Sequence, residues 1–358
     1  MSEMTSRERV LTALRCQEPD RVPFLESAID EPVALALLGK PQPENAVGGE
    51  LGTGTEPVFV GRLLGSERYT DRELVDCLGL DGWGMYMFLR HEGVQVQTEG
   101  HYMVAGGRIK SRADLTRIQL PDPDDPALYE PYRRFIAENR DSGRALFCML
   151  NLGSDPMILG MGFETFALML YDDRGLVEDL LDLYTGWYAR AVRHLCALDF
   201  DFLWFADDLA YKTGPYVSPR IFRQMFLPRF RRVADQITKP WIFHSDGNLM
   251  PLLDDLLSLG MNGLNPIEPG AMDLGDLKRR YGRSLCLAGH ISVDTLARGS
   301  EAEVEDLVRD AIRVAGPGGG YIAGSSNSIA YYCKPENARA MARAIQRYGR
   351  YPLTESSR

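Results

Sequence analysis

Short apolar segments alternate with longer amphipathic segments from about residue 140 to the end of the chain. The apolar segments have the length of buried strands, and they cover residues 145–150, 202–206, 241–244, 263–267, 284–290 and 320–323. The segments between them repeat apolar side chains at helical spacing, and they include residues 173–198, 249–259, 301–314 and 335–348. Ser218-Pro219 has the N-cap and first-turn pattern that opens a further helix. This alternation predicts repeated β-α units around a parallel sheet.

Two earlier segments have the same apolar character. Residues 21–25 (RVPFL) and 82–88 (GWGMYMF) bring the predicted strands to the number found in a (β/α)8 barrel. The main alternative is a doubly wound open sheet. Because no GxGxxG motif follows a predicted strand, the dinucleotide-binding form of that sheet has no support. We therefore predict an α/β fold of the (β/α)8 TIM-barrel type.

The pattern is looser before residue 140. Residues 41–54 are rich in Pro, Gly and polar side chains, which predicts a loop. Residues 93–110 alternate polar and apolar side chains around two glycine-containing turns, which predicts a β-hairpin. No change in composition marks a domain boundary. We interpret this region as an N-terminal insertion on one domain that spans residues 1–358.

The charge balance and the cysteines narrow the class of protein. The chain has 40 basic and 50 acidic side chains, a net charge of −10, which argues against a nucleic-acid partner. No apolar run approaches the roughly 18 residues of a membrane span. Six cysteines without a CxxC pair, behind a polar N-terminus, indicate reduced thiols and a cytoplasmic protein.

Polar side chains recur where the predicted strands end. In a parallel barrel those ends form the mouth at which chemistry takes place. His244 and Asp246 are two residues apart, so an extended segment presents both on one face. The other polar residues at strand ends are Asp207, Asp208, Tyr211, Glu268 and His290.

Each of these residues has an ordinary structural interpretation, as a turn, a cap or a hydrogen-bonded histidine. Together they predict a shared site, because neighbouring strands direct them at one mouth. Imidazole and carboxylate ligands suit Zn²⁺, Fe²⁺ or Mn²⁺. The predicted metal ligands are His244, Asp246, Glu268 and His290. Metal-free acid–base chemistry by the same groups is the alternative, and the predicted catalytic residues are His244, Asp207 and Asp208.

Several ordered segments resemble the uroporphyrinogen decarboxylase superfamily, in particular its branch of corrinoid-dependent methyltransferases. The resemblance covers nearly the whole chain. It rests on residues 4–14, 18–24 (EPDRVPF), 78–83 (LGLDGW), 243–247 (FHSDG), 260–269 (GMNGLNPIEP) and 277–282 (LKRRYG). It implies a (β/α)8 barrel whose site lies at the carboxyl ends of the strands, in agreement with the strand pattern.

The chain departs from two subgroups of this family. The decarboxylases carry an arginine-rich N-terminal segment that holds substrate carboxylates, whereas this chain has Glu26 and Asp30 there. The thiol-directed methyltransferases bind zinc through a His-x-Cys pair and a later Cys, where this chain has His244-x-Asp246 and Ser325 or Ser326. The methyltransferases that demethylate methyl ethers are more similar, because their zinc site uses acidic residues and a histidine.

The resemblance implies transfer of a methyl group from a small methoxylated, aromatic substrate to the corrinoid of a carrier protein, assisted by Zn²⁺. The expected partners are thus a small-molecule methyl donor and a corrinoid carrier, with a monomer or homodimer as the oligomeric state. The expected substrate-contacting residues are Asp81, Trp83, Tyr86, Trp204 and Tyr211. Two alternatives remain: a metal-free decarboxylase or lyase with Asp81 or Asp207 as proton relay, and a non-catalytic barrel that binds a small molecule.

Overall fold

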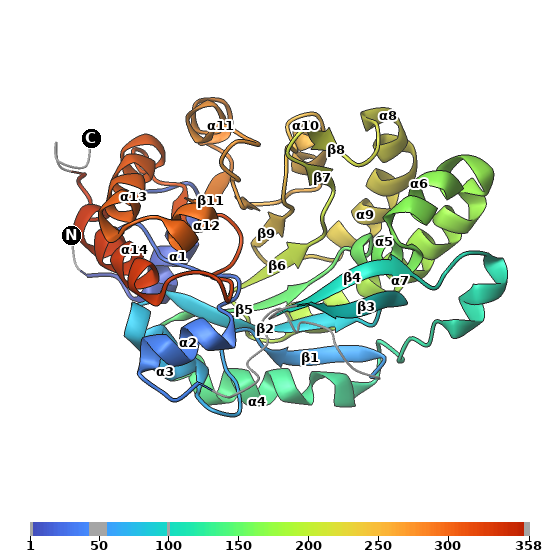
Figure 1. Ribbon diagram of the computed structural model, residues 1–358, viewed down its shortest axis with the longest axis horizontal. Helices are drawn as coiled ribbons and strands as arrows, with labels where there is room; N and C mark the ends of the chain where they lie inside the picture. Colours follow the sequence, from blue (N-terminus) through green and yellow to red (C-terminus); the bar gives the residue numbers. More distant parts are fainter. Residues whose placement is uncertain (1–2, 43–55, 99–100, 354–358) are drawn as a thin grey trace.

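The computed structural model describes residues 3–42, 56–98 and 101–353. Most of the loop expected at residues 41–54 lies outside these residues. One sheet dominates the described part, with helices arranged around it (Figure 1). The neighbouring strands in this sheet are, in order, β1 (Val58–Arg62), β2 (Gly82–Leu89), β5 (Ala145–Leu150), β6 (Phe202–Ala206), β9 (Trp241–His244), β10 (Gly263–Asn265), β11 (Cys286–Ile291) and β12 (Tyr321–Ser325).

The sheet is parallel from β2 to β12, and residues 22–25 close it into a barrel. On one side of this segment, Leu25 N donates to Ala323 O of β12 at 3.1 Å, and Ala323 N donates to Pro23 O at 2.9 Å. On the other side, Asp81 N donates to Phe24 O at 2.8 Å, directly before β2. The predicted (β/α)8 barrel is therefore confirmed, with residues 22–25 as its first strand position.

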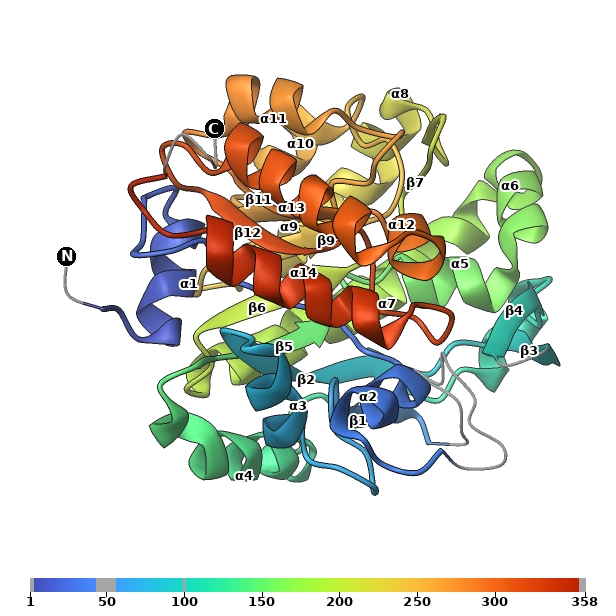
Figure 2. The same cartoon turned by 60° about the vertical axis from the view of Figure 1, so that its left-hand side comes forward.

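The helices lie outside the strands, and both views show this arrangement (Figures 1 and 2). They are α1 (Ser6–Leu14), α2 (Glu31–Leu38), α3 (Asp71–Leu78), α4 (Glu130–Asn139), α5 (Asp155–Met161), α6 (Phe163–Asp172), α7 (Arg174–Ala197), α8 (Pro219–Ile221), α9 (Leu227–Ala234), α10 (Leu253–Leu257), α11 (Leu274–Tyr281), α12 (Val293–Arg298), α13 (Glu301–Ala315) and α14 (Pro335–Tyr348). None of the helices in the described residues is long and apolar enough to cross a membrane.

Local chemistry explains several helix boundaries. Helix α13 begins after Ser300, whose side chain accepts from Glu303 N while Glu303 accepts from Ser300 N, which is a capping box. Its buried face contains Val304, Val308 and Ile312, at the spacing that packs one side of a helix against the sheet.

The structure corrects three details of the predicted elements. Strand β1 was not predicted, and it pairs antiparallel with β2 outside the parallel barrel. Strand β10 ends at Asn265 rather than at residue 267, because Pro266 has no N–H to continue the ladder. Helix α10 covers Leu253–Leu257, which is shorter than the expected residues 249–259.

The predicted hairpin is confirmed as β3 (Gly93–Thr98) and β4 (His101–Gly107). It lies beside α5 and α6 in both views (Figures 1 and 2). Gly107 permits this close approach, because a Cβ there would lie 2.2 Å from Gly160 O. The hairpin thereby places Val104, Ala105 and Gly106 on the wall of the cavity described below.

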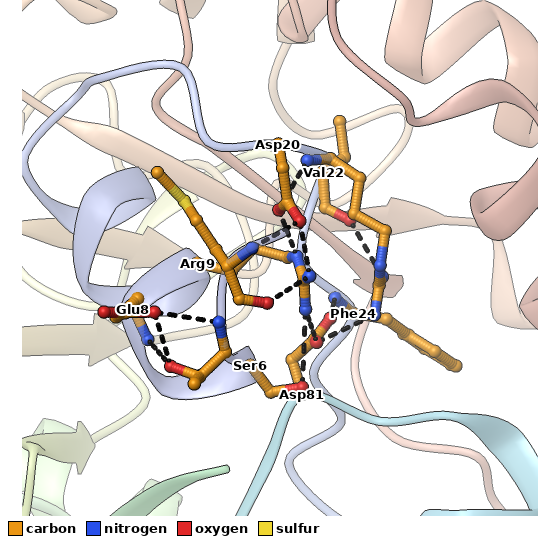
Figure 3. A network of polar contacts seen from close by, with 10 residues as sticks. Ser6, Glu8, Arg9, Asp20, Val22, Phe24 and Asp81 are labelled. Atoms are coloured by element: carbon orange, nitrogen blue, oxygen red, sulfur yellow. Dashed lines mark hydrogen bonds and ion pairs between the residues drawn. The ribbon is translucent and has the colours of Figure 1, made fainter. Parts of the chain in front are cut away.

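Asp81 lies at the opposite end of the barrel from the strand carboxyl ends, directly before β2. Its Oδ1 pairs with Arg9 Nη1 at 2.6 Å and Arg21 Nη2 at 2.8 Å, and its Oδ2 accepts from Phe24 N at 2.8 Å (Figure 3). Arg9 also binds Asp20. The carboxylate is fully buried and fully paired, so it joins α1 and residues 20–24 to the barrel. This placement argues against the predicted substrate contact of Asp81.

Candidate active site at the carboxyl ends of β5, β6 and β9

Three neighbouring parallel strands deliver polar side chains to one region. Asn151 follows β5, Asp207 and Asp208 follow β6, and His244 is the last residue of β9. Within the described residues, one group of His, Cys, Asp or Glu side chains has ligand atoms that all lie within 4.8 Å of one another, and it consists of Asp208, His244 and Asp246. We call these three residues the acidic–histidine cluster.

The contacts within this cluster are direct. Asp246 N donates to Asp208 Oδ1 at 2.9 Å, and His244 Nε2 lies 4.0 Å from Asp246 Oδ1. Asp246 Oδ1 is buried and has no hydrogen-bond partner. A buried carboxylate oxygen without a donor is unfavourable unless a cation or proton satisfies it. One nitrogen and two carboxylate groups form a donor set that fits a divalent metal such as Zn²⁺.

The electrostatics of Asp246 also indicate a shortage of positive charge. Burial and, to a smaller extent, the nearby carboxylates of Asp208 and Glu268 raise the pKa of Asp246 to about 6. His244 and the hydrogen bond from Asn327 oppose that shift. A divalent cation in the cluster would favour the ionised carboxylates, since it supplies the missing positive charge.

The other two predicted metal ligands lie outside the acidic–histidine cluster. Glu268 Oε2 accepts from Gly247 N at 3.0 Å, and its Oε1 lies 3.3 Å from Lys212 Nζ. His290 Nδ1 lies 3.1 Å from Ile267 O, and burial lowers the pKa of His290. The structure thus joins His244 and Asp246 as predicted and adds Asp208. Metal binding by Glu268 and His290 stays a prediction.

Beside the cluster is a cavity of about 540 Å³. Its wall includes Asp208 and Tyr211, which were predicted as site residues, and also Asp155, Phe163 and Tyr216. The rings of Phe163, Tyr211 and Tyr216 contact one another, with ring centroids 4.8–5.6 Å apart. They give the cavity an aromatic wall, and Tyr211 is well exposed at 56%.

Asp155 is a site residue that the sequence analysis missed. It is the first residue of α5, it lines this cavity, and its Oδ1 accepts from Asp208 N at 2.9 Å. Burial and repulsion from Asp207 and Asp208 raise the pKa of Asp155 well above its ordinary value. The only signal in the sequence is its position shortly after a predicted strand, but Ser154-Asp155-Pro156 is equally typical of an ordinary helix start.

Asp207 has a different role from the one predicted. Its carboxylate is fully buried and accepts from the backbone N–H groups of residues 152–155 and from Ser154 Oγ. Burial raises its pKa to about 6, although these hydrogen bonds favour the charged form. Because the carboxylate is occupied by the turn that begins α5, Asp207 positions Asp155 and does not reach the cavity. This finding argues against its predicted catalytic role.

Three of the predicted substrate-contacting aromatic residues also lie away from the cavity. Trp83 is fully buried and contacts Phe135 of α4 edge to face. Trp204 is buried in the barrel against Phe147 of β5, with ring centroids 5.2 Å apart. Tyr86 is half-buried and is not among the residues that line the cavity. Tyr211 alone of the four predicted aromatic residues lies on its wall.

Glu26 follows the closing segment of the barrel and is buried against the end of β12. Its Oε1 accepts from Ser325 N at 2.8 Å, and its Oε2 lies 2.7 Å from Ser325 Oγ. Burial raises the pKa of Glu26 to about 8, and the contacts with Ser325 oppose this in part. Glu26 is therefore mostly protonated at neutral pH.

We expect the stability of the protein to fall between about pH 4.5 and pH 8, because folded Glu26 keeps a proton that the unfolded chain releases. Glu26→Gln preserves the neutral shape and a donor toward Ser325, so it should raise the free energy of unfolding at pH 8 by on the order of a few kcal/mol. Urea unfolding at pH 5 and pH 8 measures this effect. The exposed Glu67→Gln is the control, and an equal pH dependence in wild type and Glu26→Gln would refute the assignment.

The fold is a (β/α)8 barrel, and the acidic–histidine cluster lies at the carboxyl ends of its strands. The family model described as uroporphyrinogen decarboxylase (URO-D) matches residues 156–348, which is more than half of the chain. The chain belongs to the uroporphyrinogen decarboxylase family. The resemblance seen in the sequence is therefore confirmed at the level of the family.

Individual relatives are distant. A uroporphyrinogen decarboxylase of Shewanella pealeana is 20% identical over 250 residues, which cover 64% of this chain and 67% of that protein. A methylated-thiol–coenzyme M methyltransferase of Methanosarcina mazei is 24% identical over 186 residues, 52% of this chain and 48% of that protein. A solved structure described as a methyltransferase from Methanosarcina mazei has a TM-score of 0.71 at 20% identity and covers 97% of this chain and 99% of that one. The structural likeness supports the fold.

Proposed function

We propose that this protein is a methyltransferase that moves a methyl group from a small methoxylated, aromatic donor to the corrinoid of a carrier protein, with a divalent metal, most simply Zn²⁺, in the acidic–histidine cluster. The observation that carries this proposal is the donor set itself. His244 Nε2 and the buried, unpartnered Asp246 Oδ1 lie 4.0 Å apart beside a cavity of about 540 Å³. The methyltransferases among the similar proteins support the reaction class.

The residues that would hold the metal are Asp208, His244 and Asp246. None of the six cysteines belongs to this group, so the site lacks the thiolates that favour soft metals and thiol substrates. A metal held by nitrogen and oxygen ligands supplies Lewis acidity to an ether oxygen, which makes that oxygen a better leaving group. This chemistry suits a methyl ether as donor.

The chain's own residues bind and orient the donor. Phe163, Tyr211 and Tyr216 form an aromatic wall against which the ring of the donor would pack. Asp155 favours its protonated form more than a free aspartate does, because burial and two neighbouring carboxylates raise its pKa. It is therefore the cavity residue that is suited to protonate the departing oxygen.

The decarboxylase alternative has less support from the site. Among the described residues that line the cavity, Lys110 is the only cation, while Asp155, Glu164 and Asp208 are acidic. Such a wall repels a substrate with several carboxylates. Asp81, one of the two residues expected to relay a proton in a decarboxylase, lies at the other end of the barrel in contact with Arg9 and Arg21.

A spectrophotometric assay with free cob(I)alamin tests the proposed reaction without the carrier protein. Zinc-loaded enzyme and a methoxylated benzoate should convert cob(I)alamin to methylcobalamin, whereas methanol and a methylated thiol should react more slowly. Asp155→Asn should lower the rate by about 10²–10⁴-fold, the usual contribution of a general acid. Carbon dioxide release from a carboxylated porphyrinogen without any methyl transfer would instead establish the decarboxylase. The carrier protein, the oligomeric state and the cytoplasmic location remain predictions.

A further inference from the structure

Two asparagines from other parts of the barrel contact the acidic–histidine cluster. The cluster lies at the ends of β6 and β9, whereas the asparagines lie at the ends of β10 and β12. Asn265 is the last residue of β10 and is almost fully buried. Its Oδ1 lies 2.6 Å from His244 Nδ1. Since a carbonyl oxygen only accepts, His244 Nδ1 must carry the proton in this contact. Of the two neutral tautomers, this contact selects the one whose Nε2 carries the lone pair, on the side of Asp246.

Asn327 acts on the other half of the cluster. It follows β12, and its Nδ2 donates to Asp246 Oδ2 at 2.6 Å. Its own backbone is fixed, because Ser27 Oγ donates to Asn327 O at 2.8 Å. With Oδ2 engaged by this amide, Oδ1 is the oxygen of Asp246 that is left buried without a partner, 4.0 Å from His244 Nε2.

We infer that Asn265 and Asn327 are positioning residues of a divalent-cation site, in which the first selects the imidazole tautomer of His244 and the second selects the free oxygen of Asp246. This inference rests on the cation site of the proposed function. The two amides act in opposite senses: Asn265 accepts a hydrogen bond and Asn327 donates one. Together they leave two acceptor atoms facing each other, an arrangement that is favourable with a cation between them and unfavourable without one.

A purely structural role for the two amides predicts a different pattern of mutant effects. Asn265 also joins β9 to β10 through its backbone, since Ser245 N donates to Asn265 O at 3.0 Å. The chain offers a matched control three residues earlier. Asn262 Oδ1 accepts from Trp241 N at 3.0 Å, at the opposite end of β9 from His244. Removal of this amide disturbs the same pair of strands without touching the cluster.

Zinc affinity, measured by competition with a chromophoric chelator, tests the inference. Asn265→Leu and Asn327→Leu should each weaken Zn²⁺ binding by about 10–100-fold, the usual effect of removing an outer-shell partner of a metal ligand. Asn265→Asp keeps the acceptor for His244 Nδ1–H and should bind Zn²⁺ at least as tightly as wild type. Asn262→Leu should keep wild-type affinity even where its melting temperature falls. Equal losses in Asn265→Leu and Asn265→Asp, or wild-type affinity in both leucine variants, would overturn the inference.

A second readout uses the metal-free protein. The ¹⁵N chemical shifts of the His244 imidazole, assigned by comparison with His244→Ala, should show a protonated Nδ1 in wild type and in Asn265→Asp. Asn265→Leu should show a mixture of tautomers, and an unchanged spectrum would contradict the role of Asn265. Wild-type protein that does not bind Zn²⁺ would refute the cation site of the proposed function. The tautomer measurement would then decide separately whether Asn265 orients His244.

Discussion

His244→Ala should abolish stoichiometric Zn²⁺ binding and, with it, methyl transfer. His244 supplies the only nitrogen of the acidic–histidine cluster, and the change leaves two carboxylates that repel each other. We expect a loss of affinity larger than the roughly 10–100-fold that follows removal of an outer-shell partner, because a ligand itself is removed. Equilibrium dialysis against Zn²⁺ followed by elemental analysis measures the effect.

The control for this experiment is His194→Ala. His194 lies on α7 at the surface, where its Nε2 is 2.8 Å from Asp124 Oδ1. This variant should keep about one equivalent of Zn²⁺, as a site for a single ion requires. Equal zinc contents in His244→Ala and wild type would show that the ion binds elsewhere, and the Lewis-acid part of the proposal would be withdrawn.

Asp81→Ala should destabilise the protein by about 3–5 kcal/mol, the usual effect of removing one partner from a buried ion pair. The carboxylate is fully buried between Arg9 and Arg21, and Arg9 is itself almost fully buried. Alanine would leave both guanidinium groups without this partner and free Phe24 N in the segment that closes the barrel. Urea unfolding measures the change in the free energy of unfolding.

Asp76→Ala is the matched surface control. Asp76 pairs with Arg144 but is 57% exposed, so its removal should change stability by no more than about 1 kcal/mol. Folded Asp81→Ala should keep wild-type affinity for the methyl donor, because Asp81 lies at the far end of the barrel. If Asp81→Ala had wild-type stability but no longer bound the methyl donor, the substrate contact predicted for Asp81 from the sequence would be supported.

The barrel was predictable because its inner strands are short and apolar throughout, as burial on both faces requires. Strand β5, for example, has the predicted boundaries. Strand β1 was not predictable in the same way, since it forms only by pairing antiparallel with β2. Residues 21–25 were predicted as a strand, although Pro23 prevents a regular ladder there and one isolated bridge, from Phe24 to Ala323 of β12, forms instead.

The site was predictable only in part. His244 and Asp246 are spaced to share one face of a strand end, and the structure joins them. Asp207 and Asp208 look alike in the sequence, yet one carboxylate turns to the backbone of residues 152–155 and the other to the cavity. Spacing does not encode that difference, because it depends on the position of the neighbouring strand. The contributions of Asp155 and of the two asparagines depend on tertiary contacts in the same way.

The position of a bound ion tests the central claim most directly. Anomalous diffraction at the zinc absorption edge, from crystals grown with Zn²⁺, should show one strong peak about 2.0–2.2 Å from His244 Nε2 and from carboxylate oxygens of Asp208 and Asp246. A peak bound by Glu268 and His290 would instead support these two ligands, which were predicted from the sequence and lie outside the acidic–histidine cluster. The absence of any peak at the carboxyl ends of β6 and β9, in protein that holds zinc elsewhere, would contradict the account.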